Sequence, residues 1–375
     1  MKKVVIAIDS FKGCLPSAEA GKAAAEGIRS VYPECEVICL PIADGGEGML
    51  DVLIMATNGQ EVPISAHDPL MRWRNTYYGI SENGETAFIE MASISGLPLV
   101  PPERRNPMLT TTYGTGEIIR DALERGCRNF IIGIGGSATN DAGLGMLQAL
   151  GFRFSDKEGK EVGTGRGEVL IKVAHIDSTF VHPALNSCRF TVACDVQNPF
   201  YGPEGAAYVF APQKGADREM VEALDAGLQN FAEVIRHTTG KDISHHPGAG
   251  AAGGMGGSLL AFLNAELKPG IQLMLEALDF SNKIKSADLI ITGEGKADRQ
   301  TLMGKVPSGI LAEARKQNIP VILLAGNIED SDELQQAGFE GVFSVNPPFI
   351  SLEEAMRPEV ACKNIQQTVE SICKK

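Results

Sequence analysis

Short runs of apolar residues at both ends of the chain alternate with segments of helical periodicity. The run at 3–8 (KVVIAI) precedes an alanine-rich segment at 17–31, and another run follows at 36–41. The alternation recurs near the other end, with apolar runs at 288–292, 320–325 and 341–345. Strands that are apolar on both faces are typical of parallel sheets covered by helices. The pattern predicts an α/β protein whose N- and C-terminal segments share one sheet.

The middle of the chain is predicted to form a second, inserted domain. The chain has 375 residues, more than one hydrophobic core usually accommodates. From about 60 to 92, short segments rich in aromatic and β-branched residues surround turns and predict hairpins. We therefore expect two α/β domains, a discontinuous one at 1–70 plus 285–375 and an inserted one at 71–284.

Composition limits the partners and the environment. Hydrophobic residues make up 43% and charged residues 22%, as in ordinary soluble proteins, and no apolar run could span a membrane. The net charge of −13 disfavours nucleic acid. The eight cysteines form no CxxC pair, which suits thiols in the reducing cytoplasm. We expect small-molecule partners, and the oligomeric state stays open.

The segment IIGIGGSATNDAGLGM at 131–146 joins an apolar strand to a glycine loop and then to a helix. Such a loop lets backbone N–H groups and the helix end approach an oxyanion. Gly135, Gly136, Ser137 and Thr139 are the candidate phosphate ligands, unless the glycines serve only to turn the chain. The segment matches neither the P-loop pattern nor Gly-x-Gly-x-x-Gly.

Two further clusters follow the first two predicted strands. Asp9, Ser10 and Lys12 lie after the first strand, and Asp44 and Glu47 lie after the second. Side chains at the carboxyl ends of parallel strands face the ligand crevice. Carboxylates there suit Mg²⁺, which takes few protein ligands together with phosphate oxygens. The alternatives are a simple turn after Asp44 and a helix capped by Ser17.

The strand at 288–292 is predicted to deliver charged side chains onto one long loop. These residues are Glu294, Lys296, Asp298, Arg299 and Lys305. Carboxylates and cations in one glycine-flanked loop are what a metal-phosphate site requires. A solvated surface loop is the alternative.

The strand at 189–194 ends on Asp195, and Asn198 follows. A carboxylate at a strand end suits a group that accepts a hydroxyl proton, while the amide orients the substrate. Both residues could instead stabilise only the turn before Pro199.

Taken together, the ordered clusters resemble the bacterial type I glycerate kinase family. The matching segments are DSFKG at 9–13, PIADGGEG at 41–48, TTYGTGEII at 111–119, GIGGSATNDAGLGML at 133–147, DVQNPFYGPEGAA at 195–207 and DLIITGEGKADRQTLMGKVPSG at 288–309. The resemblance implies transfer of the ATP γ-phosphoryl group to D-glycerate, giving mainly 2-phosphoglycerate. It also implies two α/β domains, the inserted one flavodoxin-like.

For that reaction we assign roles to the residues identified above. The candidate catalytic residues are Asp195 as base, Asp298 as a rival base and Lys12. The candidate cofactor-binding residues are Gly135, Gly136, Ser137, Thr139 and Lys305, with ATP and Mg²⁺ as the expected cofactors. The candidate substrate-binding residues are Asp9, Ser10, Lys12, Arg299 and Asn198. Asp44 and Glu294 are the candidate Mg²⁺ ligands.

Other functions remain open at this stage. The same kinase could give 3-phosphoglycerate. An NAD-dependent dehydrogenase would need an acidic residue about twenty positions after the glycine loop, and Asp156 and Glu158 lie there in a polar turn. A non-catalytic sugar-acid-binding protein could use the same cleft.

Overall fold

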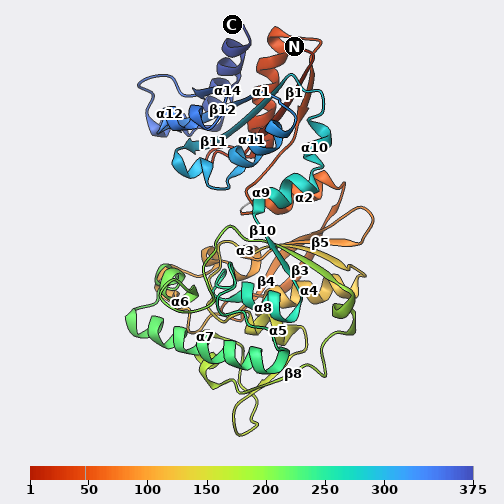
Figure 1. Ribbon diagram of the computed structural model, residues 1–375, viewed down its shortest axis with the longest axis vertical. Helices are drawn as coiled ribbons and strands as arrows, with labels where there is room; N and C mark the ends of the chain where they lie inside the picture. Colours follow the sequence, from red (N-terminus) through yellow and green to blue (C-terminus); the bar gives the residue numbers. More distant parts are fainter. Residues whose placement is uncertain (47, 375) are drawn as a thin grey trace. The chain divides into compact units, whose positions relative to one another are not determined.

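The computed structural model describes residues 1–46 and 48–374. Contacts along the chain divide it into two compact units (Figure 1). The first unit combines Met1–Asp44 with the segment from Ile271 to the C-terminal end, and the second is Gly45–Gly270. Glu47, a candidate carboxylate from the sequence, lies outside the described residues.

The first unit has a five-stranded sheet and helices on both of its faces. Its strands are β1 (Lys3–Ile8), β2 (Glu36–Cys39), β11 (Leu289–Ala297), β12 (Val321–Ile328) and β13 (Gly341–Ser344). Its helices are α1 (Ser17–Val31), α10 (Phe280–Lys283), α11 (Val306–Lys316), α12 (Ser331–Gln336), α13 (Leu352–Ala355) and α14 (Pro358–Cys373), with a 3-10 turn, η6, at Arg299–Leu302. Helix α9 (Gly270–Ala277) begins at the junction.

All five strands of this sheet are parallel, in the order β2-β1-β11-β12-β13. Strand β1 pairs with β11 from Val4↔Leu289 to Ile8↔Gly293, which confirms that the two ends of the chain share one sheet. By position along the chain the order is 2-1-3-4-5, the flavodoxin-like arrangement. The flavodoxin-like arrangement was expected for the inserted domain. The structure places it in the discontinuous first unit instead.

The two faces of this sheet are both buried, as the apolar strands predict. Val4, Ile6 and Ile8 belong to a core that includes the alanine-rich face of α1 and the face of α14 bearing Ile365. The intervening residues of β1 are buried as well, and α11 packs against β1, β11 and β12. This layering leaves the carboxyl ends of the strands available for a site.

The second unit has a six-stranded mixed sheet and a two-stranded ribbon. Its strands are β3 (Gln60–His67), β4 (Trp73–Ile80), β5 (Thr86–Glu90), β6 (Asn129–Gly133), β7 (Arg153–Ser155), β8 (His175–Asp177), β9 (Arg189–Ala193) and β10 (Glu266–Lys268). Its helices are α2 (Met49–Ala56), α3 (Ala92–Ser95), α4 (Tyr113–Glu124), α5 (Leu144–Ala149), α6 (Ala206–Phe210), α7 (Arg218–Thr239) and α8 (Met255–Phe262). Short 3-10 turns lie at Leu97–Leu99, Pro102–Arg104, Gly167–Lys172, Pro183–Ser187 and Pro212–Lys214.

The strands of the larger sheet follow the order of the chain, β3-β4-β5-β6-β9-β10. Strands β3, β4 and β5 are antiparallel neighbours, as the hairpin pattern predicts, and β5, β6, β9 and β10 are parallel. Sequential order and antiparallel hairpins explain why this unit is not flavodoxin-like, since that topology is wholly parallel with a crossed order.

Both junctions between the units lie earlier in the chain than the predicted 70/71 and 284/285. Strand β3 pairs with β4 from Gln60↔Ile80 to His67↔Trp73, and α2 packs on β4 and β5. Residues 45–70 therefore belong to the second unit. Residues 271–284 form most of α9 and all of α10 in the first unit. A hairpin cannot be divided between domains without losing its hydrogen-bond ladder.

Strand β11 is longer than the predicted run at 288–292. It continues to Ala297 because its later residues pair with β12, from Glu294↔Ala325 to Ala297↔Ile328. Glu294 and Lys296 are thus on a strand and not on a long loop. Within residues 1–46 and 48–374, no helix is both long and apolar enough to cross a membrane.

The contact between α1 and α14 gives a test of the first unit. A Cβ atom on Gly27 of α1 would lie 2.6 Å from the backbone oxygen of Gln366, whereas one on Gly21 would meet its nearest atoms at 3.9 Å. We expect Gly27→Ala to destabilise the protein by about 1–3 kcal/mol through overpacking. Gly21→Ala should be neutral or stabilise it by up to about 1 kcal/mol, because alanine favours helix. Urea denaturation monitored by circular dichroism measures the free energy of unfolding of both variants. Equal denaturation midpoints for Gly27→Ala and Gly21→Ala would contradict the close contact between α1 and α14.

Candidate active site

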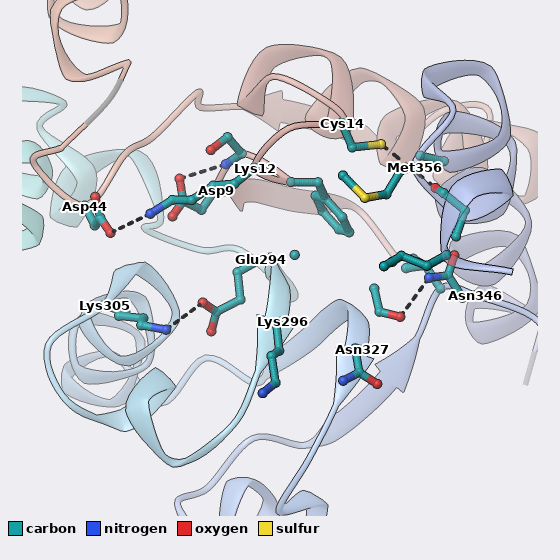
Figure 2. A pocket seen from close by; sticks show the side chains of 18 residues that line it. Asp9, Lys12, Cys14, Asp44, Glu294, Lys296, Lys305, Asn327, Asn346 and Met356 are labelled. Atoms are coloured by element: carbon teal, nitrogen blue, oxygen red, sulfur yellow. Dashed lines mark hydrogen bonds and ion pairs between the residues drawn. The ribbon is translucent and has the colours of Figure 1, made fainter. Parts of the chain in front are cut away.

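The first unit contains a pocket of about 450 Å³ at the carboxyl ends of its strands (Figure 2). Its charged lining residues are Asp9, Lys12, Asp44, Glu294, Lys296 and Lys305. The pocket lies where the strand order reverses, between β1 and β11, because the chain passes from β1 outward to β2 and later from β11 to β12 on the other side. Ligands of open α/β sheets bind at such a point.

Ser17 connects the two loops that carry Asp9 and Asp44. Its hydroxyl donates to the Ile8 carbonyl oxygen at 2.6 Å and accepts from the Ile42 N–H at 2.9 Å. It makes no side-chain capping bond at the start of α1, so the helix-capping interpretation of Ser17 is wrong. The hydroxyl instead holds the ends of β1 and β2 in register.

The carboxyl group of Asp9 is buried in this pocket. Burial raises its pKa to about 7, the Asp44 carboxylate acts in the same direction, and a hydrogen bond from the Ser10 N–H at 2.7 Å opposes them. Burial also raises the pKa of Glu294, and its Oε1 has no hydrogen-bond partner. Buried polar atoms without partners are rare, so Glu294 is available for a ligand.

Lysines balance part of this negative charge. Lys12 Nζ lies 3.8 Å from Asp44 Oδ2, and Lys305 Nζ lies 3.5 Å from Glu294 Oε2 (Figure 2). The Lys12 side chain is 70% exposed, which leaves it able to turn toward an anion. The pocket therefore combines carboxylates with movable cations.

Asp298 and Arg299 do not line this pocket. Asp298 Oδ1 accepts from the Gln300 N–H at 2.8 Å and caps η6, and Lys296 Nζ is 3.5 Å from its other oxygen. Arg299 forms ion pairs with Glu333 and Asp330 and is largely exposed. The capped turn η6 thus places Arg299 against acidic residues at the start of α12, whereas Asp298 interacts with its own turn and with Lys296.

The glycine loop of the second unit follows β6. Its shape is fixed by backbone bonds, with the Leu97 N–H donating to the Gly136 oxygen at 2.8 Å and the Ala138 N–H to the Ser95 oxygen at 2.9 Å. Gly136 has a φ of +72°, and Gly135 and Gly136 are exposed. Ser137 and Thr139 are buried, and Thr139 Oγ1 has no partner. The loop is therefore open to solvent on one side and anchored on the other.

The helix after this loop is not free to bind phosphate as the sequence suggested. Buried Asp141 accepts from the N–H groups of Gly143 and Gly145 at the start of α5, and from Thr112. Its carboxylate takes the place that a ligand anion would occupy. The prediction that this helix end helps to bind phosphate is therefore wrong, and only the glycine loop remains a candidate phosphate site.

Lys214 is a residue that the sequence did not indicate. It is 2% exposed, and its Nζ donates to Ser137 Oγ and to the Thr139 oxygen, both at 2.7 Å. Burial lowers the pKa of Lys214 to about 7, while Asp141 acts in the opposite direction. The only signal was an isolated lysine in PQKG, which has no recognisable spacing. Through these two hydrogen bonds the buried Lys214 holds the inner side of the glycine loop in place.

Asp195 lies at the same sheet edge as the glycine loop, because β6 and β9 are parallel and Gly133 is in register with Ala193. Its Oδ1 accepts from the Gly270 N–H at 2.8 Å, and the residue is exposed. Asn198 Nδ2 donates to the Glu204 oxygen at 2.8 Å. The structure thus brings Asp195 near the loop and engages Asn198 in its own turn.

The first-unit pocket also fits a hard cation. Among the described residues no group of three His, Cys, Asp or Glu side chains is close enough to hold a metal ion alone. Mg²⁺ commonly uses one or two carboxylates together with phosphate oxygens and water. Asp44 and the unpartnered Oε1 of Glu294 supply suitable oxygens.

The buried carboxyl of Asp9 predicts a specific pH dependence of stability. Its pKa is 3.8 in the unfolded chain and about 7 when folded, so the folded state binds more protons between these values and loses stability as pH rises from about 4 to 7. Asp9→Asn should remove that loss and stabilise the protein at pH 8 by up to about 4 kcal/mol. Thermal unfolding at pH 4.5 and 8 checks this, with the exposed Asp332→Asn as control. An unchanged melting temperature at pH 8 would contradict the buried carboxylate.

Comparisons with known proteins agree with this architecture. The model of the glycerate kinase family matches residues 4–375. Glycerate kinase of Bacillus subtilis (strain 168) is 46% identical over 371 residues, covering 99% of this chain and 96% of the relative. Glycerate 2-kinase of Escherichia coli (strain K12) is 48% identical over 356 residues, covering 95% and 93%.

The fold is also that of a solved structure. A crystal structure from Salmonella typhimurium LT2, assigned as a glycerate kinase 2, superposes with a TM-score of 0.91 at 44% identity. The match covers 100% of this chain and 97% of that one. On these grounds the chain belongs to the glycerate kinase family.

Proposed function

We propose that the protein phosphorylates D-glycerate at its 2-hydroxyl group with ATP as donor. The main supporting observation is the pocket at the strand-order reversal of the first unit. Three carboxylates and two lysines line it: Asp9, Asp44, Glu294, Lys12 and Lys305. Carboxylates for a cation and cations for a phosphoryl group are the groups that such a transfer requires. Family membership supports the same function.

The reaction forms one oxygen–phosphorus bond and breaks another. The glycerate 2-hydroxyl oxygen attacks the γ-phosphorus, the bond to the bridging β–γ oxygen breaks, and ADP leaves. The hydroxyl proton must go to a base. We assign Asp195 to this role, because it is exposed at the end of β9 beside the glycine loop. Hydrogen bonding to the Gln300 N–H and the nearby lysines lower the pKa of Asp298, which reduces its basicity.

The remaining roles follow from charge and position. In the first unit, Asp44 and Glu294 would hold Mg²⁺, which would supply positive charge to the phosphates when bound. Lys12 and Lys305 neutralise negative charge on the substrates, and Asp9 and Ser10 line the same wall. In the second unit, Gly135, Gly136, Ser137 and Thr139 bind an oxyanion through the loop that Lys214 supports.

Arg299 is a weaker candidate for substrate binding than the sequence suggested. Both of its ion-pair partners are acidic residues at the start of α12, and contacting a substrate would require it to leave them. Asn198 is likewise engaged, by the Glu204 oxygen. We retain both as proposed substrate contacts of lower rank.

The cellular setting is part of the proposal. All eight cysteines are free thiols, which supports a reducing compartment and hence the cytoplasm. The substrates are small molecules, glycerate and ATP. The dehydrogenase and sugar-acid-binding alternatives find no support in the family to which the chain belongs.

An assay of ADP release tests the reaction. Purified protein should release ADP with D-glycerate in the presence of Mg²⁺ and lose this activity with excess chelator. Phosphorus NMR of the product should show 2-phosphoglycerate. A 3-phosphoglycerate signal would move the site of transfer, and reduction of NAD by a hydroxy acid without ADP release would refute the kinase.

Substitution of the two aspartates tests the base. Asp195→Asn preserves shape and removes basicity, so we expect kcat to fall by about 10²- to 10⁴-fold with a small change in KM; a loose transition state would reduce the loss. Asp298→Asn is the matched control, and it should keep most of kcat. The reverse result would assign the base to Asp298.

A further inference from the structure

The first-unit pocket has two chemically different ends. The charged groups Asp9, Lys12, Asp44, Glu294 and Lys305 gather on one side, whereas Cys14 and Met356 lie on the other (Figure 2). Further apolar lining comes from Phe11, Val345, Leu352 and Ala355. The proposed phosphoryl transfer gives a role to the charged end of the pocket, but it gives none to the apolar end.

Large apolar side chains at this end of the pocket are exposed to solvent, whereas in a protein core they would be covered by neighbouring residues. Leu352 and Met356 are 75% and 40% exposed, although both are large hydrophobic residues lining the pocket. Met356 also covers the loop after β1, because a Cβ atom on Gly13 would lie 3.3 Å from its terminal methyl. Exposed apolar side chains that line a concave surface mark a ligand site.

The two substrates of the proposed reaction differ in which end they fit. Every carbon of glycerate carries oxygen, so glycerate has little apolar surface to bury. A nucleotide instead carries a planar, largely apolar base at one end and a phosphate chain at the other. Its asymmetry matches that of the pocket. We propose that the apolar end, between the loop after β1 and helix α13, is the nucleobase subsite of ATP; this rests on the proposed kinase function.

Backbone and amide groups complete the subsite. Gly295 of β11 and Gly326 of β12 line the floor and have no side chains, so a flat ligand can approach the sheet edge. Asn346 is held rigidly, with its Nδ2 donating to the Gly326 oxygen at 2.8 Å and its Oδ1 accepting from Asn364. The Asn327 amide lies on the same side of the pocket floor (Figure 2) and supplies polar groups for the edge of a base.

The proposal also gives the nucleotide a direction. With the base against Met356 and Leu352, the phosphates extend toward Lys12 and Lys305 and toward the carboxylates that would share Mg²⁺. The opposite orientation would bury triphosphate charge against apolar side chains, and burial of an unpaired charge is strongly unfavourable. Charge and hydrophobicity thus select one orientation.

Alkylation of Cys14 tests occupancy without turnover. Cys14 lines the apolar end and is partly exposed, whereas Cys39 on β2 is exposed outside the pocket. Labelling with N-ethylmaleimide is followed peptide by peptide in the mass spectrometer. ADP at about 20 times its Kd should slow Cys14 labelling roughly 20-fold and leave Cys39 unchanged, and adenosine should protect at higher concentration.

The control ligands separate the base from the other groups. D-glycerate and inorganic triphosphate should leave Cys14 labelling within about twofold of the free protein. Equal protection by triphosphate, protection by D-glycerate alone, or no protection by ADP would each overturn the assignment. Labelling of Cys14 requires no catalysis. Failure of the kinase assay would therefore contradict the proposed reaction, whereas loss of Cys14 protection would contradict the nucleobase subsite.

Substitution of an apolar wall residue tests the same subsite kinetically. Leu352→Ala should raise the KM for ATP by roughly 5- to 20-fold, from the lost apolar contact, with the KM for D-glycerate unchanged. Phe349→Ala is the matched control, because Phe349 is fully exposed nearby and does not line the pocket. An unchanged KM for ATP in Leu352→Ala, or a rise confined to D-glycerate, would refute the nucleobase assignment.

Discussion

The parallel pairing of β1 with β11 is the constraint on which the candidate site depends. Residues about 285 positions apart become neighbours in one ladder, from Val4↔Leu289 to Ile8↔Gly293. The Asp9 N–H continues that ladder by donating to the Gly293 oxygen at 2.9 Å. Asp9 and Glu294 therefore face one pocket because their strands run in the same direction and end at the same edge.

This arrangement opposes the stability of the folded chain. Burying Asp9 close to Asp44 and Glu294 disfavours the ionised carboxylate, and the rise in its pKa measures that cost. The sheet tolerates it because both faces are filled by apolar side chains. A cation that enters the pocket recovers part of this electrostatic energy, so the same repulsion that costs stability favours the binding of positive charge.

The second unit prepares its glycine loop in another way. A buried lysine, Lys214, holds Ser137 and Thr139 from below, and buried Asp141 occupies the first amides of α5. Oxygen and nitrogen atoms of Thr139 and Asn140 stay buried without partners. Unsatisfied groups are expensive in a core, and their presence on a fixed loop is consistent with a role in holding a polar ligand.

The sequence by itself determined the strand-and-helix alternation, the shared sheet of the two chain ends and the residues that follow β1 and β2. Apolar runs and turn residues act locally, so they can be interpreted one segment at a time. The tertiary structure decided which unit is flavodoxin-like, the extension of β11 to Ala297, the pairing of Arg299 with acidic residues at the start of α12 and the place of Lys214 beneath the loop. Each of these depends on pairing or packing between distant segments, whose free energy is set by neighbours that local periodicity does not specify.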